Sequence, residues 1–129
     1  MINADLFPTL ISIAIFGAIG AIARYFCSYL PDYMGIPIGT ATVNIFGSFL
    51  LGFATSLFLV TTYPTWLKTG LTTGFLGAFT TFSTFTVDNA KLIQEQSYLA
   101  VGVNIMGQLV VGIIMALFGL YLGTRCFQG

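Results

Sequence analysis

The sequence predicts an all-α membrane protein with four transmembrane helices, the third of which is broken near the middle of the membrane. The chain has 129 residues, of which only 6% are charged and 57% are hydrophobic. Its mean hydropathy is +0.95. The few charges leave four long uncharged runs, at 6–23, 33–67, 69–87 and 96–124. A helix needs about 20 apolar residues to cross a lipid bilayer, so these runs are of the right size.

The same composition excludes several classes of protein. A soluble domain carries about 25% charged residues, so this chain has too few to cover a surface that faces water. A water-soluble enzyme, a nucleic-acid-binding protein and a disordered protein are therefore excluded. The chain has no histidine and only two cysteines, Cys27 and Cys126. Neither a protein-built zinc or copper site nor a disulfide framework is expected.

We place the spans at about 9–30, 38–61, 66–92 and 98–124, within a single domain over 1–129. The first has no basic start and no clear cleavage site, so it is interpreted as a span rather than a signal peptide. The second is separated from its neighbours by Pro37 and by a turn at 61–65. Rings with polar tips favour the membrane interface. Such residues lie near the predicted ends, at Tyr29, Tyr33, Tyr63, Trp66, Tyr98 and Tyr121.

The third span has an unusual composition for a membrane helix. In residues 69–87, seven threonines, one serine and three glycines occupy 11 of 19 positions. Threonine and glycine are poor helix formers, and a helix in lipid breaks only where protein or water surrounds the break. We therefore predict a non-helical turn within about 74–82, whose free carbonyls are suited to a small cation. The alternative is an unbroken helix whose hydroxyls bond back to the preceding turn.

Aromatic and amide residues are the candidate ligand-binding residues. Phe82 and Phe85 are three positions apart and share a helix face beside Ser83 and Thr84. The edges of their rings are positive and the faces negative, although packing is the ordinary role of such rings.

Amides lie within two other spans. Asn44 is in the second span, and Asn104 and Gln108 share a face of the fourth. Their N–H groups could bind an anion and their carbonyls a cation. The alternative is that these amides only form hydrogen bonds between helices.

The positive charges are evenly divided between the two sides of the predicted membrane protein. Lys68 and Arg125 lie on the side of the termini, and Arg24 and Lys91 lie on the other. Because orientation follows the excess of lysine and arginine, this balance allows insertion in both directions and hence an antiparallel homodimer. The alternative is that so few charges do not decide the orientation. Arg24 is expected to reach the interface or to raise the positive potential at an entrance.

No acidic residue lies in the middle of a predicted span, whereas proton-coupled carriers usually need one there. This favours passive conduction over a small multidrug exporter. A purely structural membrane subunit is the other alternative, and the polar residues clustered in the last three spans argue against it.

Three segments together resemble the CrcB/Fluc family of small fluoride channels: GAIAR at 20–24, GTATVN at 39–44 and GFLGAFTTFSTF at 74–85. The resemblance implies a dual-topology homodimer in the bacterial inner membrane that exports fluoride passively through two pores. It implies that fluoride passes Asn44, Phe82, Phe85, Ser83 and Thr84. It also implies a vestibule arginine at Arg24 and a structural Na+ shared by the two subunits, bound by the backbone carbonyls of Gly77 and Thr80.

The sequence departs from the family pattern at four positions. Asp88 stands where many members carry glutamate, and Asn104 and Gln108 stand where some carry tyrosine and serine. Gly112 replaces a further hydroxyl residue. We expect Asn104 and Gln108 to belong to the fluoride pore, with a polar track whose hydrogen bonds are chemically altered.

Overall fold

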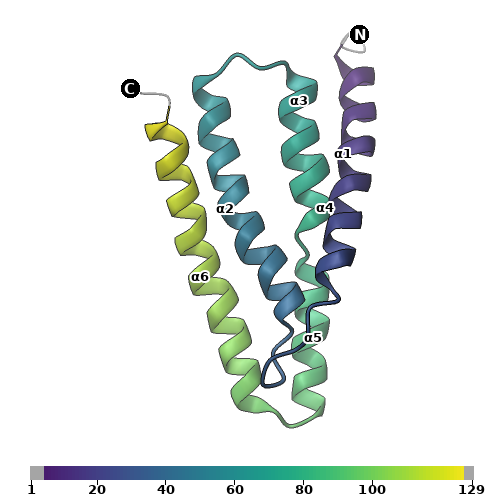
Figure 1. Ribbon diagram of the computed structural model, residues 1–129, viewed down its shortest axis with the longest axis vertical. Helices are drawn as coiled ribbons and strands as arrows, with labels where there is room; N and C mark the ends of the chain where they lie inside the picture. Colours follow the sequence, from purple (N-terminus) through teal and green to yellow (C-terminus); the bar gives the residue numbers. More distant parts are fainter. Residues whose placement is uncertain (1–4, 127–129) are drawn as a thin grey trace.

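The computed structural model describes residues 5–126, and within them it contains helices and no strand (Figure 1). Three long helices are α1 (Leu6–Cys27), α2 (Ile38–Val60) and α6 (Tyr98–Arg125). Between α2 and α6 the chain forms four shorter elements, which are α3 (Thr65–Thr69), η1 (Gly70–Leu76), α4 (Gly77–Phe79) and α5 (Phe82–Gln94).

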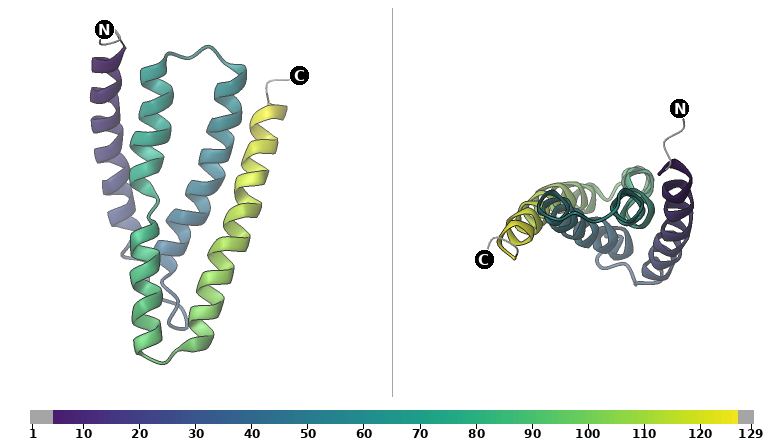
Figure 2. Two further views of the ribbon diagram at one scale, coloured as in Figure 1. Left: turned by 180° about the vertical axis from the view of Figure 1, so that it is seen from behind. Right: turned by 90° about the horizontal axis from the view of Figure 1, so that it is seen from above.

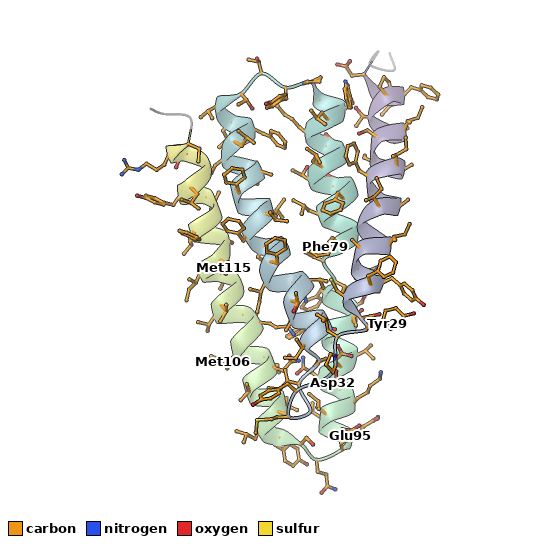
Figure 3. All side chains as sticks on the ribbon, in the orientation of Figure 1. Tyr29, Asp32, Phe79, Glu95, Met106 and Met115 are labelled. Carbon is orange, nitrogen blue, oxygen red and sulfur yellow. The ribbon has the colours of Figure 1, made fainter. Side chains whose placement is uncertain are left out.

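The three long helices of the described chain are long and apolar enough to cross a membrane. Most of their large apolar side chains point outwards, and Leu59 and Leu99 are about four-fifths exposed. Figure 3 shows that the acidic side chains of Asp32 and Glu95 lie in the half of the molecule that carries the turn between α5 and α6. An apolar outer surface of this extent is suited to lipid or to another protein.

The segment predicted as the third span is interrupted. Elements α3, η1 and α4 follow one another without a gap, and η1 is a π-helix within the threonine- and glycine-rich stretch. Thr80 and Thr81 then adopt extended backbone conformations, and the helix resumes at Phe82. The predicted turn within 74–82 is confirmed in position. In Figure 2 it lies about halfway along the molecule, while its depth in a membrane stays a prediction.

Small residues allow the helices to approach closely. The main packing partners are α2 with α6 and α1 with η1. A methyl group at Gly119 of α6 would overlap the carbonyl oxygen of Phe49 in α2. A methyl group at Gly20 of α1 would likewise overlap the carbonyl oxygen of Phe75 in η1. The backbones therefore touch at both interfaces, as is usual between helices in lipid.

The start of α1, the turn between α2 and α3, and the end of α6 lie at one end of the molecule (Figure 1). Lys68 stabilises this end, because its Nζ donates hydrogen bonds to the carbonyls of Phe58 and Thr61, each at 2.9 Å. These carbonyls belong to the C-terminal end of α2, where a positive charge is favourable.

Candidate functional site

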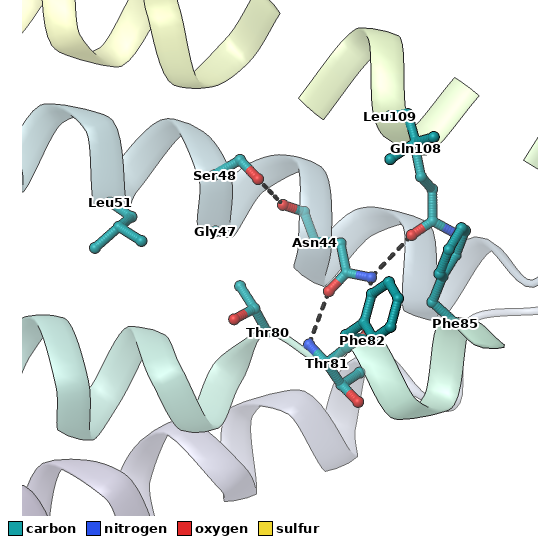
Figure 4. A pocket seen from close by; sticks show the side chains of 10 residues that line it. All are labelled: Asn44, Gly47, Ser48, Leu51, Thr80, Thr81, Phe82, Phe85, Gln108 and Leu109. Carbon is teal, nitrogen blue, oxygen red and sulfur yellow. Dashed lines mark hydrogen bonds between the residues drawn. The ribbon is translucent and has the colours of Figure 1, made fainter. Parts of the chain in front are cut away.

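Asn44 of α2 binds the backbone of Thr81, the second of the two extended residues (Figure 4). Its Oδ1 accepts a hydrogen bond from the Thr81 backbone N–H at 2.8 Å, and its Nδ2 donates to the Thr81 carbonyl at 3.0 Å. The side-chain amide thereby pairs with the N–H and the carbonyl of a residue that is no longer helical. Without Asn44 these two backbone groups would lose this partner. The same Nδ2 donates its second hydrogen to Gln108 Oε1 at 2.8 Å. Both N–H donors of Asn44 are therefore in use.

Four side-chain amides are linked into a series that runs from Asn44 to the backbone of α5. Gln108 Nε2 donates to Asn104 Oδ1 at 2.8 Å, and Asn104 Nδ2 donates to Asn89 Oδ1 at 3.1 Å. Asn89 Nδ2 then donates to the Phe85 carbonyl at 2.8 Å. We refer to Asn44, Gln108, Asn104 and Asn89 as the amide series. The last three are almost completely buried, so their mutual hydrogen bonds replace those that water would make.

A cavity of about 260 Å³ lies beside the interruption, between α2, α5 and α6 (Figure 4). Its lining combines amides, hydroxyls and aromatic rings and contains no charged side chain. The lining residues are Asn44, Gly47, Ser48, Leu51, Thr80, Thr81, Phe82, Phe85, Gln108 and Leu109. The cavity is thus neutral but rich in oriented dipoles.

The two phenylalanines of this cavity differ in their surroundings. Their ring centroids are 5.8 Å apart and their planes are tilted by 41°. Phe85 is 8% exposed, whereas Phe82 is 75% exposed. One ring is therefore fixed by its neighbours, while the other lies open at the edge of the cavity.

Hydroxyl groups organise the start of α5. Thr81 Oγ1 accepts from the Thr84 backbone N–H at 3.2 Å and donates to Thr84 Oγ1 at 3.0 Å. It also lies 3.3 Å from Ser83 Oγ. Thr81 therefore acts as the N-cap of the helix. Ser83 and Thr84 are exposed and do not line the cavity.

The interruption leaves backbone carbonyls without their helical donors. In a continuous helix the Thr81 N–H would bond to the Gly77 carbonyl, but here it bonds to Asn44. The Thr84 N–H would bond to the Thr80 carbonyl, but here it bonds to the Thr81 hydroxyl. Gly77 is exposed on this chain. Freed carbonyl oxygens are ligands for hard cations, so this chemistry fits a bound Na+.

The structure brings together only some of the predicted site residues. Asn44, Phe82, Phe85 and Gln108 line one cavity, and Asn104 lies behind it through its bond to Gln108. Arg24 is half-buried on α1 and does not line it.

Sequence reasoning did not single out Asn89, nor the hydrogen bond from Thr40 to Asp88 at 2.7 Å. The spacing of four between Phe85 and Asn89 was a usable signal, because it allows a side-chain amide to bond back to the preceding turn.

Comparisons with known proteins agree with the resemblance seen in the motifs. The family described as "CrcB-like protein, Camphor Resistance (CrcB)" matches residues 11–120. A "Fluoride-specific ion channel FluC" of Geobacter metallireducens is 41% identical over 80% of this chain and 86% of its own length. The protein of the same name from Syntrophotalea carbinolica is 39% identical over 90% of this chain and 98% of its own. "Fluoride-specific ion channel FluC 1" of Staphylococcus aureus is 39% identical, with 83% and 89% covered.

Proposed function

The chain belongs to the CrcB family, whose named relatives are channels and not enzymes, and from this premise we propose that it is a fluoride-selective passive ion channel. It is a multi-pass membrane protein, and we assign it to the bacterial inner membrane with the interrupted segment as a fourth span. Fluoride would move down its own gradient, which in a cell that has accumulated it means export.

The observation that carries this proposal is the neutral cavity beside the interruption. Fluoride is small and strongly hydrated, so a pore has to replace its water with well-placed donors and positive dipole ends. Phe82 and Phe85, whose ring edges are positive, and the amide of Gln108 supply such groups at one cavity. A carboxylate in the lining would repel the anion, and none of the lining residues is acidic.

The individual donors differ in availability. Asn44 has committed both hydrogens, so it acts on the anion by shaping the interruption, or directly if one of its bonds opens. Gln108 Nε2 donates one hydrogen to Asn104 and has a second one to offer. Ser83 and Thr84 would continue the path along α5, and Arg24 would raise the positive potential at the vestibule.

A second copy of the chain would complete the site. The cavity is open, and Phe82 exposes three-quarters of its surface at its edge. Covering this ring requires another protein surface, because an anion path open to lipid could not be lined with donors on all sides. The even division of lysine and arginine supports an antiparallel homodimer with two pores.

Gly77 and Thr80 would hold a structural Na+ at the dimer interface through their freed carbonyls. The ion would supply positive charge that offsets the buried carbonyl dipoles and favours an anion nearby. Thr80 contributes its backbone, since its hydroxyl already donates to the Leu76 carbonyl at 2.9 Å.

The proposal is tested by fluoride efflux from liposomes containing the purified protein, measured with a fluoride electrode and with chloride efflux in parallel. We expect rapid fluoride release with chloride retained. The variants Phe82→Ile and Phe85→Ile should lower the fluoride flux while the protein stays folded. Folded protein that releases no fluoride refutes the function, and full flux in both variants refutes the role of the rings.

A further inference from the structure

Asn89 lies at the far end of the amide series and has no role in the function proposed above. It is 6% exposed and lies on α5, one turn after Phe85. Its Nδ2 donates to the Phe85 carbonyl and its Oδ1 accepts from Asn104. This side chain therefore joins the backbone of a cavity residue to the buried amides of α6.

The amide series has a single direction, because both of its ends are fixed by the backbone. The Phe85 carbonyl can only accept, so Asn89 must present its nitrogen to it and its oxygen to Asn104. At the other end the Thr81 N–H can only donate, so Asn44 must present its oxygen there. Each amide between the two ends has one orientation that satisfies both neighbours, and linked hydrogen bonds of this kind reinforce one another.

The direction determines which Gln108 atoms are committed to hydrogen bonds and which hydrogen is left for a ligand. Gln108 accepts from Asn44 through its oxygen and donates to Asn104 through its nitrogen, which leaves one N–H of Gln108 without an acceptor in the described part of the chain. Gln108 is also the member of α6 whose amide lines the cavity with Phe82 and Phe85 (Figure 4).

We propose that Asn89 is a positioning residue for anion recognition, because it supplies the last acceptor of the amide series and so keeps a free N–H of Gln108 directed at the cavity. Without Asn89, the Asn104 amide, which is 2% exposed, has a donor with no partner. Buried donors seek partners, so Asn104 would turn and release Gln108. This inference rests on the proposed function and names the device that orients its donor.

The test uses the full-length protein in liposomes with the variants Asn89→Leu, Asn104→Leu and the double variant. Losing one hydrogen bond to a charged group weakens binding of that group about tenfold or more, so each single variant, which releases the Gln108 donor, should lower the fluoride flux per folded protein about tenfold. The double variant should be no worse than either single variant, because residues in one network are not additive. The control Leu92→Val removes a methylene from another buried position of α5 and should leave the flux per folded protein unchanged.

A second measurement separates this inference from the function itself. The side-chain NH₂ signals of ¹⁵N-labelled protein in detergent report the surroundings of Gln108, with Gln108→Leu identifying its signals. We expect Asn89→Leu to shift them and Leu92→Val to leave them in place. Unshifted signals, wild-type flux in Asn89→Leu, or additive losses in the double variant would each overturn the proposal. If the wild-type protein carries no fluoride but the signals shift, the positioning role is supported and only the function fails.

Discussion

Replacing Asn44 with leucine tests whether one side chain holds the interruption open. Leucine has the same branched arrangement of side-chain heavy atoms but makes none of the three hydrogen bonds that Asn44 forms with Thr81 and Gln108. A hydrogen bond contributes about 1 kcal/mol net in soluble proteins and about 0.6 kcal/mol between membrane helices. Three of them amount to about 2–3 kcal/mol. Thr81 is 7% exposed, so water is poorly placed to substitute.

This loss should appear first at the backbone of the interruption. Since tenfold corresponds to about 1.4 kcal/mol, local opening around Thr81 should become roughly 30- to 150-fold more frequent. Hydrogen–deuterium exchange of peptides covering 77–84, measured in detergent, reads this out directly, and equilibrium unfolding gives the total.

Ser48→Ala is the matched control for Asn44→Leu. Ser48 lines the same cavity, but its hydroxyl only bonds back to the Asn44 carbonyl within α2, so its removal should change neither quantity appreciably. If Asn44→Leu exchanges and unfolds like the wild-type protein, the assignment of Asn44 as the support of the interruption is wrong.

Three further predictions concern the rest of the fold. Lys68→Met should lower the free energy of unfolding by about 1–3 kcal/mol, because two carbonyls at the end of α2 lose a charged donor. The control Lys91→Met, at an exposed position, should leave the free energy of unfolding unchanged. Equal effects of the two variants would contradict the capping role of Lys68. Gly119→Ala should destabilise the packing of α2 on α6 by about 1–3 kcal/mol, while Gly102→Ala, which meets nothing within 4 Å, should be neutral or stabilising in the same unfolding assay. Replacing Na+ by K+ or Li+ should weaken the dimer, as measured by size-exclusion chromatography. Thr80→Ala should leave the dimer intact, since the backbone carbonyl of residue 80 remains. A dimer that is equally stable in all three cations would count against a specific Na+ site.

The sequence was informative where composition decides the structure. Low charge and long apolar runs predict helices of membrane length, and three such helices are found. The excess of threonine and glycine in 69–87 predicts an interruption within nine residues, but not which two residues become extended. That choice depends on Asn44, which is 37 residues away along the chain and pairs with Thr81 only after α2 and α5 have packed together.

The candidate site was less predictable, because hydrogen-bond partners are set by packing. Asn104 and Gln108 could be placed on one helix face by their spacing, and they do bond to each other. Their partners Asn44 and Asn89 come from two other helices, and no periodicity reveals such pairs. Asn89 also follows Asp88 near the end of the predicted span, where a polar residue is expected to face water, although in the structure it is buried.

The amide series also bears on how the protein responds to acidity. Asparagine and glutamine side chains do not titrate in the range where carboxylates, imidazoles and amines change charge, and the chain contains no histidine. The directions of these four hydrogen-bonded amides are therefore the same in an acidified cell as in a neutral one. A pH dependence of transport would then have its origin in the ion and its protonated form in solution, or in groups outside the amide series, and not in a change of the donors that face the cavity.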